Sequence, residues 1–500
     1  MLDYAIVGAG SAGCALAARL SEDDGVDVLL LEAGGPDTRR EIRIPAAFTK
    51  LFKSEVDWAY QTEPQAHLGG RTVYWPRGKV LGGSSSLNAM MVIAGSYRDY
   101  DDWPWGWGDV APVYEQVRAT LRPEELRDPN PLTVAFVEAA QQAGIARSPG
   151  LEPTQLDGVR LTRVTQRRGR RNSAADAYLR PALERPNLTV RTNAHVTRVV
   201  VEGTRAVGVE VDDEIVRARE IVLCGGTVNS PQLLLLSGIG PREELERHGI
   251  PVALDLPGVG ASLQDHLAAG ALYESRKPIT LYSAESPLQI LRYLLLRKGM
   301  LTSNVAEAAA FVRSQPELPA ADLELLFTPV LFQDEGLVPP SAHGFTIGVV
   351  LLQPKSSGSV RLRSADPFDA PVIEPRYLSA SDDLETLVRG VELARRVAAM
   401  PAFEPFAGTE LEPGDAPIEA AIREKATTLY HPVGTCRFGD VVDAELRVRG
   451  LHGLSIADAS VIPRVPRGHT HLPTLMVAER AAAFLRGRAV SEAELLSATV

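Results

Sequence analysis

Cysteine is scarce in this sequence of 500 residues, which contains only three, Cys14, Cys224 and Cys436. They are odd in number and far apart, and none has the paired spacing of a zinc site. The sequence therefore predicts neither a disulfide framework nor a bound metal. Such sparse use of cysteine is typical of a reducing compartment, so we expect a cytoplasmic protein.

Long apolar runs and basic stripes are also missing. The longest apolar runs, such as 233–236 and 293–296, fall far short of the roughly 20 residues that span a bilayer. The first apolar residues lead straight into glycines rather than into a signal sequence. A net charge of −11 would repel a nucleic acid, although Arg167, Arg168, Arg170 and Arg171 form one arginine-rich loop. We expect a soluble protein without a transmembrane segment or a nucleic-acid partner.

What the chain does contain is enough apolar material for a large core, with 45% hydrophobic and 23% charged residues. It is too long for one compact unit, so we expect two intertwined domains. The strongest local pattern lies at residues 3–35, where an apolar strand, a glycine turn, an alanine-rich helix and a second apolar strand follow one another. This order predicts a βαβ unit.

The glycine turn "GAGSAG" has the spacing of a dinucleotide-binding turn. Gly8 allows the tight turn, Gly10 lets the backbone approach a pyrophosphate, and Gly13 lets helix and strand pack closely. Glu32 ends the next strand, where a carboxylate accepts hydrogen bonds from a ribose and would repel a 2'-phosphate. FAD or NAD is therefore favoured over NADP, with a ligand-free glycine turn as the weaker alternative.

Further along, residues 187–226 alternate apolar and polar positions and predict a meander that returns to the first sheet. Residues 456–463 predict a strand and turn, and 473–487 a helix closed by glycine. We expect an α/β (overall α+β) fold, with a Rossmann-like dinucleotide-binding domain at 1–150, 190–270 and 425–500, which the family resemblance described below identifies as an FAD-binding domain. A substrate domain at 151–189 and 271–424 would be built on an antiparallel sheet with helices. Residues 488–500 are expected to form a loosely held tail.

A second glycine-rich loop, "LGGSSSLNAMM", offers backbone donors and serine hydroxyls to a phosphate or a flavin edge. A plain surface loop is the alternative. Residues 78–101, which contain it, resemble the first signature of the glucose-methanol-choline (GMC) oxidoreductase family, apart from Val92. Residues 226–240, "GTVNSPQLLLLSGIG", match the second signature throughout, and 257–266, 430–437 and 456–463 are similar to later blocks.

The resemblance implies a non-covalent FAD, because members with a covalent flavin carry a histidine where this chain has Leu87. Ala94 replaces an arginine common in the choline-dehydrogenase-like branch, so that branch's substrate does not transfer directly. The residues implied to bind FAD are Gly8, Gly10, Ser11, Ala12, Gly13, Glu32, Ala33, Gly82, Gly83, Ser84, Ser85, Asn88, Val196, Asp458, Ala459, His469, Pro473 and Thr474.

Two histidines are implied to act on the substrate. Alcohol oxidation needs a group that takes the hydroxyl proton, and imidazole titrates near the working pH. His431 in "YHPVGT" and His469 before the C-terminal helix fall on the family's two active-site positions, whereas His471 is the weaker candidate. Glu307 and Phe327 are the pocket candidates of the substrate domain, with an ordinary helix-face carboxylate as the favoured alternative for Glu307.

The implied function is oxidation of a primary or secondary alcohol to the carbonyl, with hydride transfer to FAD. Oxygen or a quinone-like compound would then take the electrons, and the sequence does not choose between them. A hydroxynitrile-lyase-like or photochemical member of the family is the alternative. Outside enzymes, a flavin-stabilised binding protein is the remaining class.

Overall fold

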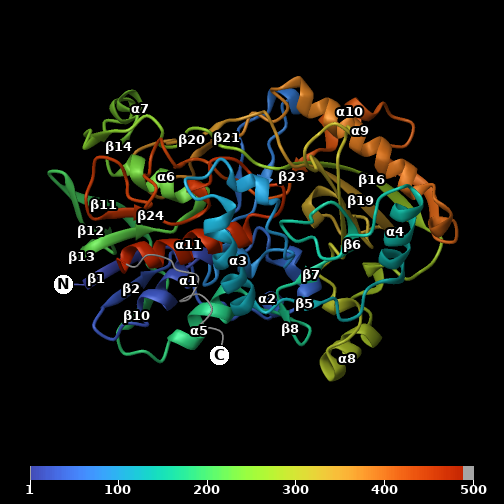
Figure 1. Ribbon diagram of the computed structural model, residues 1–500, viewed down its shortest axis with the longest axis horizontal. Helices are drawn as coiled ribbons and strands as arrows, with labels where there is room; N and C mark the ends of the chain where they lie inside the picture. Colours follow the sequence, from blue (N-terminus) through green and yellow to red (C-terminus); the bar gives the residue numbers. More distant parts are fainter. Residues whose placement is uncertain (1, 488–500) are drawn as a thin grey trace.

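The computed structural model describes residues 2–487, so the tail predicted at 488–500 lies outside the described residues (Figure 1). Two large sheets form the framework of the molecule. Figure 1 shows one sheet toward each end of the long axis, with the chain crossing between them several times. The predicted mixed fold, with a Rossmann-like FAD-binding part and an antiparallel second part, is confirmed.

The first sheet contains the predicted βαβ unit, formed by β1 (Leu2–Val7), α1 (Ser11–Leu20) and β2 (Val28–Leu31). Strand β2 is buried at every position, which is typical of a central parallel strand covered on both faces. Parallel neighbours extend the sheet on both sides of this unit. They are β10 (Leu188–Arg191), β13 (Glu214–Leu223) and β24 (Leu454–Ile456).

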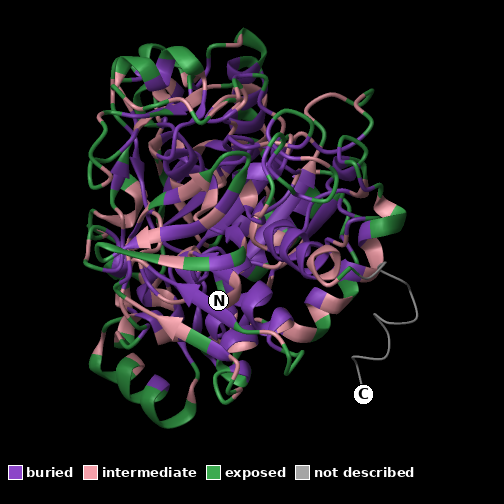
Figure 2. Ribbon diagram, turned by 90° about the vertical axis from the view of Figure 1, so that its left-hand side faces the viewer, coloured by how far each residue is buried: buried purple, intermediate pink, exposed green. Residues whose placement is uncertain are grey.

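The predicted meander is also confirmed. Strands β11 (Val196–Glu202), β12 (Arg205–Val211) and β13 pair in antiparallel order. The first half of β13 belongs to this meander, and its second half pairs in parallel with β1. The expected C-terminal helix is α11 (His471–Leu485), followed by Gly487 at φ +67°, and it packs against α1 and α3 (Trp107–Leu121). Figure 2, which faces this end of the molecule, shows intermediate and exposed segments over a mostly buried interior, and the meander strands combine buried positions with intermediate and exposed ones.

The second sheet is antiparallel throughout. Its order is β22, β16, β19, β18, β17 and β6, with β23 (Thr427–Thr428) beside β16. The strands are β6 (Gly158–Leu161), β16 (Leu267–Ser275), β17 (Ala308–Val312), β18 (Leu323–Thr328), β19 (Gly344–Leu351) and β22 (Ala407–Glu412). Helices α4 (Pro131–Gln142) and α9 (Ser381–Ala398) contact the sheet, and α10 (Ile418–Lys425) contacts α9.

The period of two along these strands separates their two faces. On β18 and β19, odd-numbered side chains such as Phe327, Phe345 and Ile347 form an apolar core with α9. Each large apolar side chain buried in this way contributes about 1.5–3 kcal/mol. Even-numbered positions such as Leu326 and Thr346 face the other way and line the cavity described below. The alternation thus gives the sheet one structural face and one face toward the site.

Three strands do not follow the predicted domain limits. Strand β10 begins at Leu188, before the limit at 190, and β16 begins at Leu267, before the limit at 271. Strand β23 joins the antiparallel sheet although it follows the limit at 425. The division into domains stays a prediction. Within residues 2–487, none of the helices combines the length and apolar content that a bilayer crossing requires. The same residues form no cluster of three or more metal-binding side chains.

Candidate active site

A cavity of about 800 Å³ is lined by residues of both sheets. One part of its wall comes from the glycine turn after β1 and the end of β13. The facing part comes from β16, β18 and β19. The cavity is long enough to contact Glu32 near one end of the first sheet and His431 beside the second, so one elongated ligand can reach both.

The glycines of the turn after β1 have two different roles. Gly8 and Gly13 are needed for packing within the protein, whereas Gly10 leaves space in the cavity. A Cβ on Gly13 would lie 1.9 Å from the carbonyl oxygen of Gly8, and Gly8 itself has φ +101°. A Cβ on Gly10 would meet nothing nearer than the Cys224 carbonyl oxygen at 4.0 Å, and Gly10 lines the cavity. Glycine at position 10 therefore leaves room beside the N-terminus of α1, where backbone N–H groups favour an anion.

Glu32 is buried and lines the cavity. Its carboxylate accepts the backbone N–H of Ala9 at 2.8 Å and that of Gly34 at 2.9 Å, which ties the end of β2 to the glycine turn. Burial raises the pKa of Glu32 to about 7, and these two donors oppose that rise. Because each carboxylate oxygen has a second lone pair, the group can still accept a hydroxyl of a ligand.

The second glycine-rich loop, residues 81–91 (the serine loop), packs directly on the glycine turn. The N–H of Gly82 donates to the Ala9 carbonyl at 2.8 Å, and a Cβ on Gly83 would lie 2.6 Å from the Cα of Gly10. Ser85 is buried, and its hydroxyl donates to the Gly82 carbonyl. The loop is therefore part of the cavity wall, and the alternative of a surface loop is wrong.

The cavity brings together most of the predicted cofactor residues. Those lining it are Gly8, Gly10, Ser11, Ala12, Glu32, Ala33, Gly83, Ser84, Ser85, Asn88, Val196, Asp458, Ala459, His469 and Thr474. Gly13, Gly82 and Pro473 do not line it, and their roles toward the cofactor stay predictions. Gly13 packs on Gly8, Gly82 makes the turn at φ +87°, and Pro473 is buried inside α11.

One buried nitrogen in the cavity wall fits a polar ligand. Nε2 of His471 has no partner among residues 2–487, and its Nδ1 lies 3.0 Å from Ser11 Oγ. Burial lowers the pKa of His471 to about 4. Arg171 does not line the cavity, but its Nη1 donates to the Ser85 carbonyl and to Asn88 Oδ1 and so supports the loop behind the wall. Together with the open space at Gly10, the free nitrogen of His471 fits a dinucleotide.

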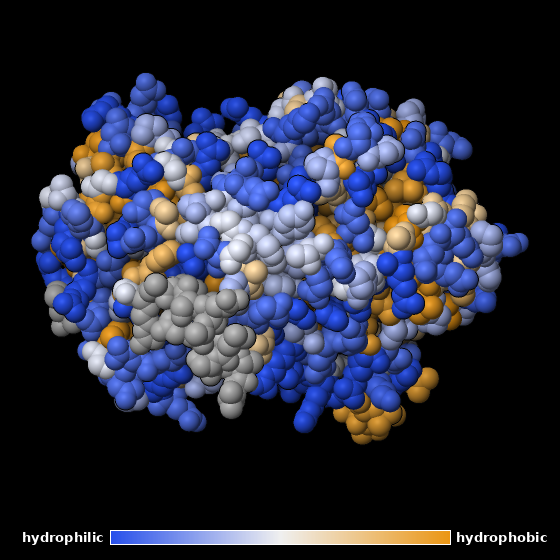
Figure 3. Space-filling model, in the orientation of Figure 1, coloured by the Kyte–Doolittle hydropathy of each residue, from blue (hydrophilic) through white to orange (hydrophobic). Residues whose placement is uncertain are grey.

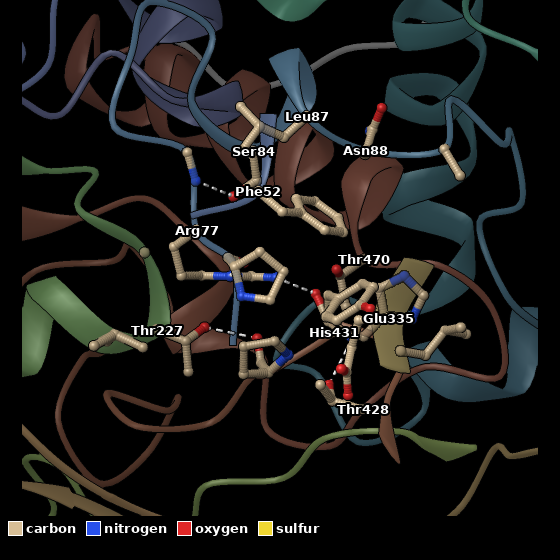
Figure 4. Close-up of a pocket in the computed structure, with 18 of the residues that line it drawn as sticks. Phe52, Arg77, Ser84, Leu87, Asn88, Thr227, Glu335, Thr428, His431 and Thr470 are labelled. Carbon is tan, nitrogen blue, oxygen red and sulfur yellow. Dashed lines mark hydrogen bonds between the residues drawn. The ribbon is translucent and has the colours of Figure 1, made fainter. Parts of the chain in front are cut away.

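His431 lies on a strained turn in the cavity wall (Figure 4). The preceding residue, Tyr430, has φ +66°, which is rare for a residue with a side chain. The backbone N–H of His431 donates to Asp265 Oδ1 at 2.8 Å, and Asp265 also accepts the hydroxyls of Tyr377 and Thr428. Figure 4 shows His431 beside the same space as Phe52 and Leu87. The turn thus holds the imidazole toward the cavity.

A third histidine, His266, determines which ring nitrogen of His431 carries a proton. His266 is fully buried, with Nε2 3.1 Å from the Leu352 carbonyl oxygen and Nδ1 3.0 Å from Nδ1 of His431. A carbonyl only accepts, so Nε2 of His266 carries the proton. Burial lowers the pKa of His266 to about 3, which keeps it neutral and leaves Nδ1 as an acceptor. His431 therefore donates from Nδ1, and its Nε2 keeps a free lone pair.

His469 lies beside His431, with ring centroids 4.7 Å apart. Its backbone N–H donates to the Ile93 carbonyl, and its Nε2 lies 3.2 and 3.3 Å from the two carboxylate oxygens of Glu324. Glu324 is fully buried on β18. Being an even-numbered position, it is on the same face as Leu326 and Thr328, so its carboxylate is directed toward the site.

Burial is the main reason that His431 is neutral. Its pKa lies well below the ordinary value of 6.5, because burial opposes protonation and the charge of Arg77 adds to this effect. Arg77 is held beside it, donating to the Tyr430 carbonyl. Two adjacent imidazoles are thus in different environments, one paired with a carboxylate and the other paired with a neutral imidazole.

The remaining predicted residues have other roles. Glu307 lies just before β17 rather than on a helix, and it accepts Ser303 Oγ, Thr133 Oγ1 and the Asn130 N–H. Phe327 is in the α9 core and does not line the cavity. The expectation of a helix-face carboxylate at Glu307 is wrong, because strand pairing of the following residues overrides the helical appearance of "AEAAAF".

The sequence reasoning missed Asp265, His266 and Glu324. A signal existed for the first two, since they end the family-like block at 257–266. For Glu324 the signal is a single carboxylate among apolar residues in the strand "LELLFT", a position where a buried charge needs a partner.

Comparison with known proteins agrees with this geometry. The GMC oxidoreductase family models match residues 2–268 and 354–478. An alcohol dehydrogenase [acceptor] of Pseudomonas putida is 41% identical, covering 97% of this chain and 96% of the relative. Human mitochondrial choline dehydrogenase is also 41% identical, covering 97% and 90%.

Among solved structures, pyridoxine 4-oxidase from Mesorbium loti superimposes with a TM-score of 0.89 at 32% identity, covering 98% of this chain and all of the other. GMC oxidoreductases are FAD-binding proteins, and their alcohol and choline dehydrogenases act on CH–OH donors. The chain belongs to the GMC oxidoreductase family, and it is an FAD-dependent alcohol oxidase or dehydrogenase.

Proposed function

We propose that the chain oxidises a primary or secondary alcohol to the carbonyl compound, with His431 as the base that removes the hydroxyl proton. The observation that carries the proposal is the neutral imidazole of His431, whose Nε2 lone pair is left free by the bond to His266. A free, buried acceptor in a cavity wall is suited to proton removal. Relatives named alcohol dehydrogenase and pyridoxine 4-oxidase support a hydroxyl-bearing substrate.

The proposed FAD site uses the cavity-lining residues of the first sheet. The glycine turn and α1 would hold the pyrophosphate, Glu32 the ribose and Val196 the adenine, with Asp458 and Ala459 near the pyrophosphate. When bound, FAD accepts the hydride that leaves the alcohol carbon. Leu87 lines the cavity and offers no nucleophile, which supports a non-covalent cofactor.

The proposed chemistry requires the two imidazoles to act differently. His431 accepts the O–H proton at Nε2, so that the oxygen can form the carbonyl as the carbon loses its hydride. His469 is paired with the Glu324 carboxylate, which fixes its ring, and its other nitrogen is available to the substrate oxygen. Apolar and aromatic groups around them, including Phe52, Leu87 and Tyr430, exclude water from this end of the cavity.

The experiment is an anaerobic panel of aryl, alkyl, sugar and amino alcohols mixed with the flavin-loaded protein. Bleaching of the flavin absorbance by at least one alcohol class in the dark is expected, together with formation of the matching aldehyde or ketone. Cleavage of a cyanohydrin without bleaching would instead indicate a lyase, and turnover only under illumination a photochemical enzyme. Reoxidation of the bleached protein with oxygen and, separately, with a quinone identifies the acceptor class.

A further inference from the structure

Helix α8 (Pro287–Leu296) exposes its apolar side to solvent. Of its ten residues, Leu288, Ile290, Leu291, Leu294, Leu295 and Leu296 are 41–72% exposed. The helix projects from the lower right of Figure 1, and Figure 3 shows a hydrophobic patch at the same place. Monomeric proteins rarely expose so many neighbouring large apolar side chains without a function.

The inner side of α8 is held by polar contacts. Gln289 accepts the Met300 N–H at 3.2 Å, and Arg292 forms an ion pair with Asp128 at 2.7 Å. Tyr293 is buried and donates to the Arg43 carbonyl at 3.3 Å. This orientation is the reverse of an ordinary surface helix, whose apolar stripe faces the core. The leucines are therefore presented outward by specific contacts.

Cationic side chains flank the C-terminal end of the helix. Arg297 and Lys298 follow it, and the arginine-rich hairpin of β8 (Gln166–Arg167) and β9 (Arg170–Arg171) packs beside them. A Cβ on Gly169 would lie 2.9 Å from the Arg297 carbonyl oxygen, and the charge of Arg170 acts on Tyr293. Within residues 2–487, no salt bridge involves Arg167, Arg168, Arg170, Arg297 or Lys298. The nearby carboxylates of Asp128 and Glu285 are paired with Arg292 and Lys50, and the carboxylate of Glu124 accepts the backbone N–H of Arg168.

We propose that α8 and the β8–β9 hairpin form a docking surface for an anionic lipid bilayer. The leucines would enter the boundary between headgroups and acyl chains, and the five cations would meet lipid phosphates, as in interfacial amphipathic helices. A second copy of the chain fits less well, because a two-fold contact through α8 would place two cationic clusters near each other.

The test is co-sedimentation of the flavin-loaded protein with vesicles of phosphatidylcholine alone or mixed with phosphatidylglycerol. Binding to the mixed vesicles is expected, and it weakens with added salt. The preference for anionic lipid is diagnostic, because a net charge of −11 would otherwise repel the protein from them. Absence of binding to the mixed vesicles would overturn the proposal.

Three variants separate the contributions. Leu288→Gln, Leu294→Gln and Leu295→Gln together are expected to lower vesicle binding about tenfold or more. Replacing Arg167, Arg168 and Arg170 with Glu is expected to abolish the preference for anionic lipid. The matched control replaces Val134, Leu183 and Ile215, which are 51%, 46% and 52% exposed elsewhere, with Gln and should bind normally.

Flavin content and activity with a soluble acceptor should be unchanged in every variant, which shows that folding is intact. Equal loss of vesicle binding in the control and leucine variants would overturn the proposal. A second result would also overturn the proposal. This is a protein that does not bind vesicles but forms a dimer in analytical ultracentrifugation, with the leucine replacements dissociating that dimer.

Discussion

At the residue scale, the chemistry depends on which imidazole nitrogen carries a proton. Three histidines and one carboxylate form a series from Leu352 through His266 and His431 to His469 and Glu324. The carbonyl at one end fixes the proton on His266, and this in turn fixes the proton on His431. At the other end, the carboxylate holds His469. The proton acceptor is thus selected by groups that do not themselves touch the substrate.

The pH dependence of flavin bleaching by an alcohol tests the state of His431. Its pKa is depressed below 6.5, so the imidazole stays neutral through neutral pH and gains a proton only in more acidic solution. A protonated Nε2 cannot accept the hydroxyl proton. We expect the anaerobic rate constant to be level at pH 6.5 and above, and to fall below that value. A decline centred above pH 6.5 would be incompatible with this assignment.

Glu324 is predicted to be a positioning residue for His469. Glu324→Leu removes the acceptor and should lower the rate constant of flavin bleaching about 100-fold, because a misplaced group loses much of its effect. Glu324→Gln keeps an oxygen acceptor and should recover part of this loss. The control measurement is flavin content, which both variants should retain. Wild-type rates in the leucine variant would show that the carboxylate is dispensable.

At the element scale, the glycine turn and the serine loop act as one unit. The turn after β1 packs against Gly83, and its first and third glycines are required by contacts within the protein. The second glycine, Gly10, has ordinary backbone angles and free space beside it. In this short segment, two glycines are therefore needed for folding and one for ligand binding. Single substitutions can distinguish the two effects.

Gly10→Ala is expected to weaken FAD binding, whereas Gly13→Ala is expected to destabilise the fold. The methyl added at position 10 would enter the cavity without touching the protein, so thermal stability without flavin should be unchanged while FAD affinity falls about tenfold or more. A methyl added at position 13 overlaps the Gly8 carbonyl and should destabilise the protein by about 1–3 kcal/mol or more. Thermal unfolding and flavin titration of both variants measure this contrast. Equal stability losses in the two would refute it.

Much of the cofactor side of the site was predictable, because the glycine turn, Glu32 and the C-terminal helix follow local patterns of spacing. His431 and His469 were identified by their motifs. Their partners were not, since His266 and Glu324 reach them through contacts between distant segments that no local pattern encodes. Glu324 illustrates the reason: only the strand register of β18 shows that its side chain faces the site.

At the scale of the whole molecule, the cavity joins the two sheets. Its walls come from segments spread from Val7 to Thr474, and several of its polar groups have no partner within the described residues. A ligand that satisfies these groups should connect both halves of the fold. The stability of the molecule is therefore expected to depend on the cofactor.

Removal of FAD is predicted to lower the midpoint of thermal unfolding, and added FAD to restore it in a concentration-dependent manner. A ligand that binds only the folded state stabilises it by about 2.7 kcal/mol at 100 times its dissociation constant. Thermal scans of deflavinated protein at several FAD concentrations measure the effect, with free flavin lacking the adenosine part as the control. A midpoint that is insensitive to FAD would argue against the proposed site.

The most direct test of the account is the anaerobic stopped-flow comparison of wild type with His431→Asn, using an alcohol that bleaches the wild-type flavin. His452→Asn is the matched control, because this exposed histidine does not line the cavity. The account predicts a fall of about 10²–10⁴-fold in the rate constant for His431→Asn, with flavin still bound, and no change for the control. Bleaching of His431→Asn at the wild-type rate would contradict it.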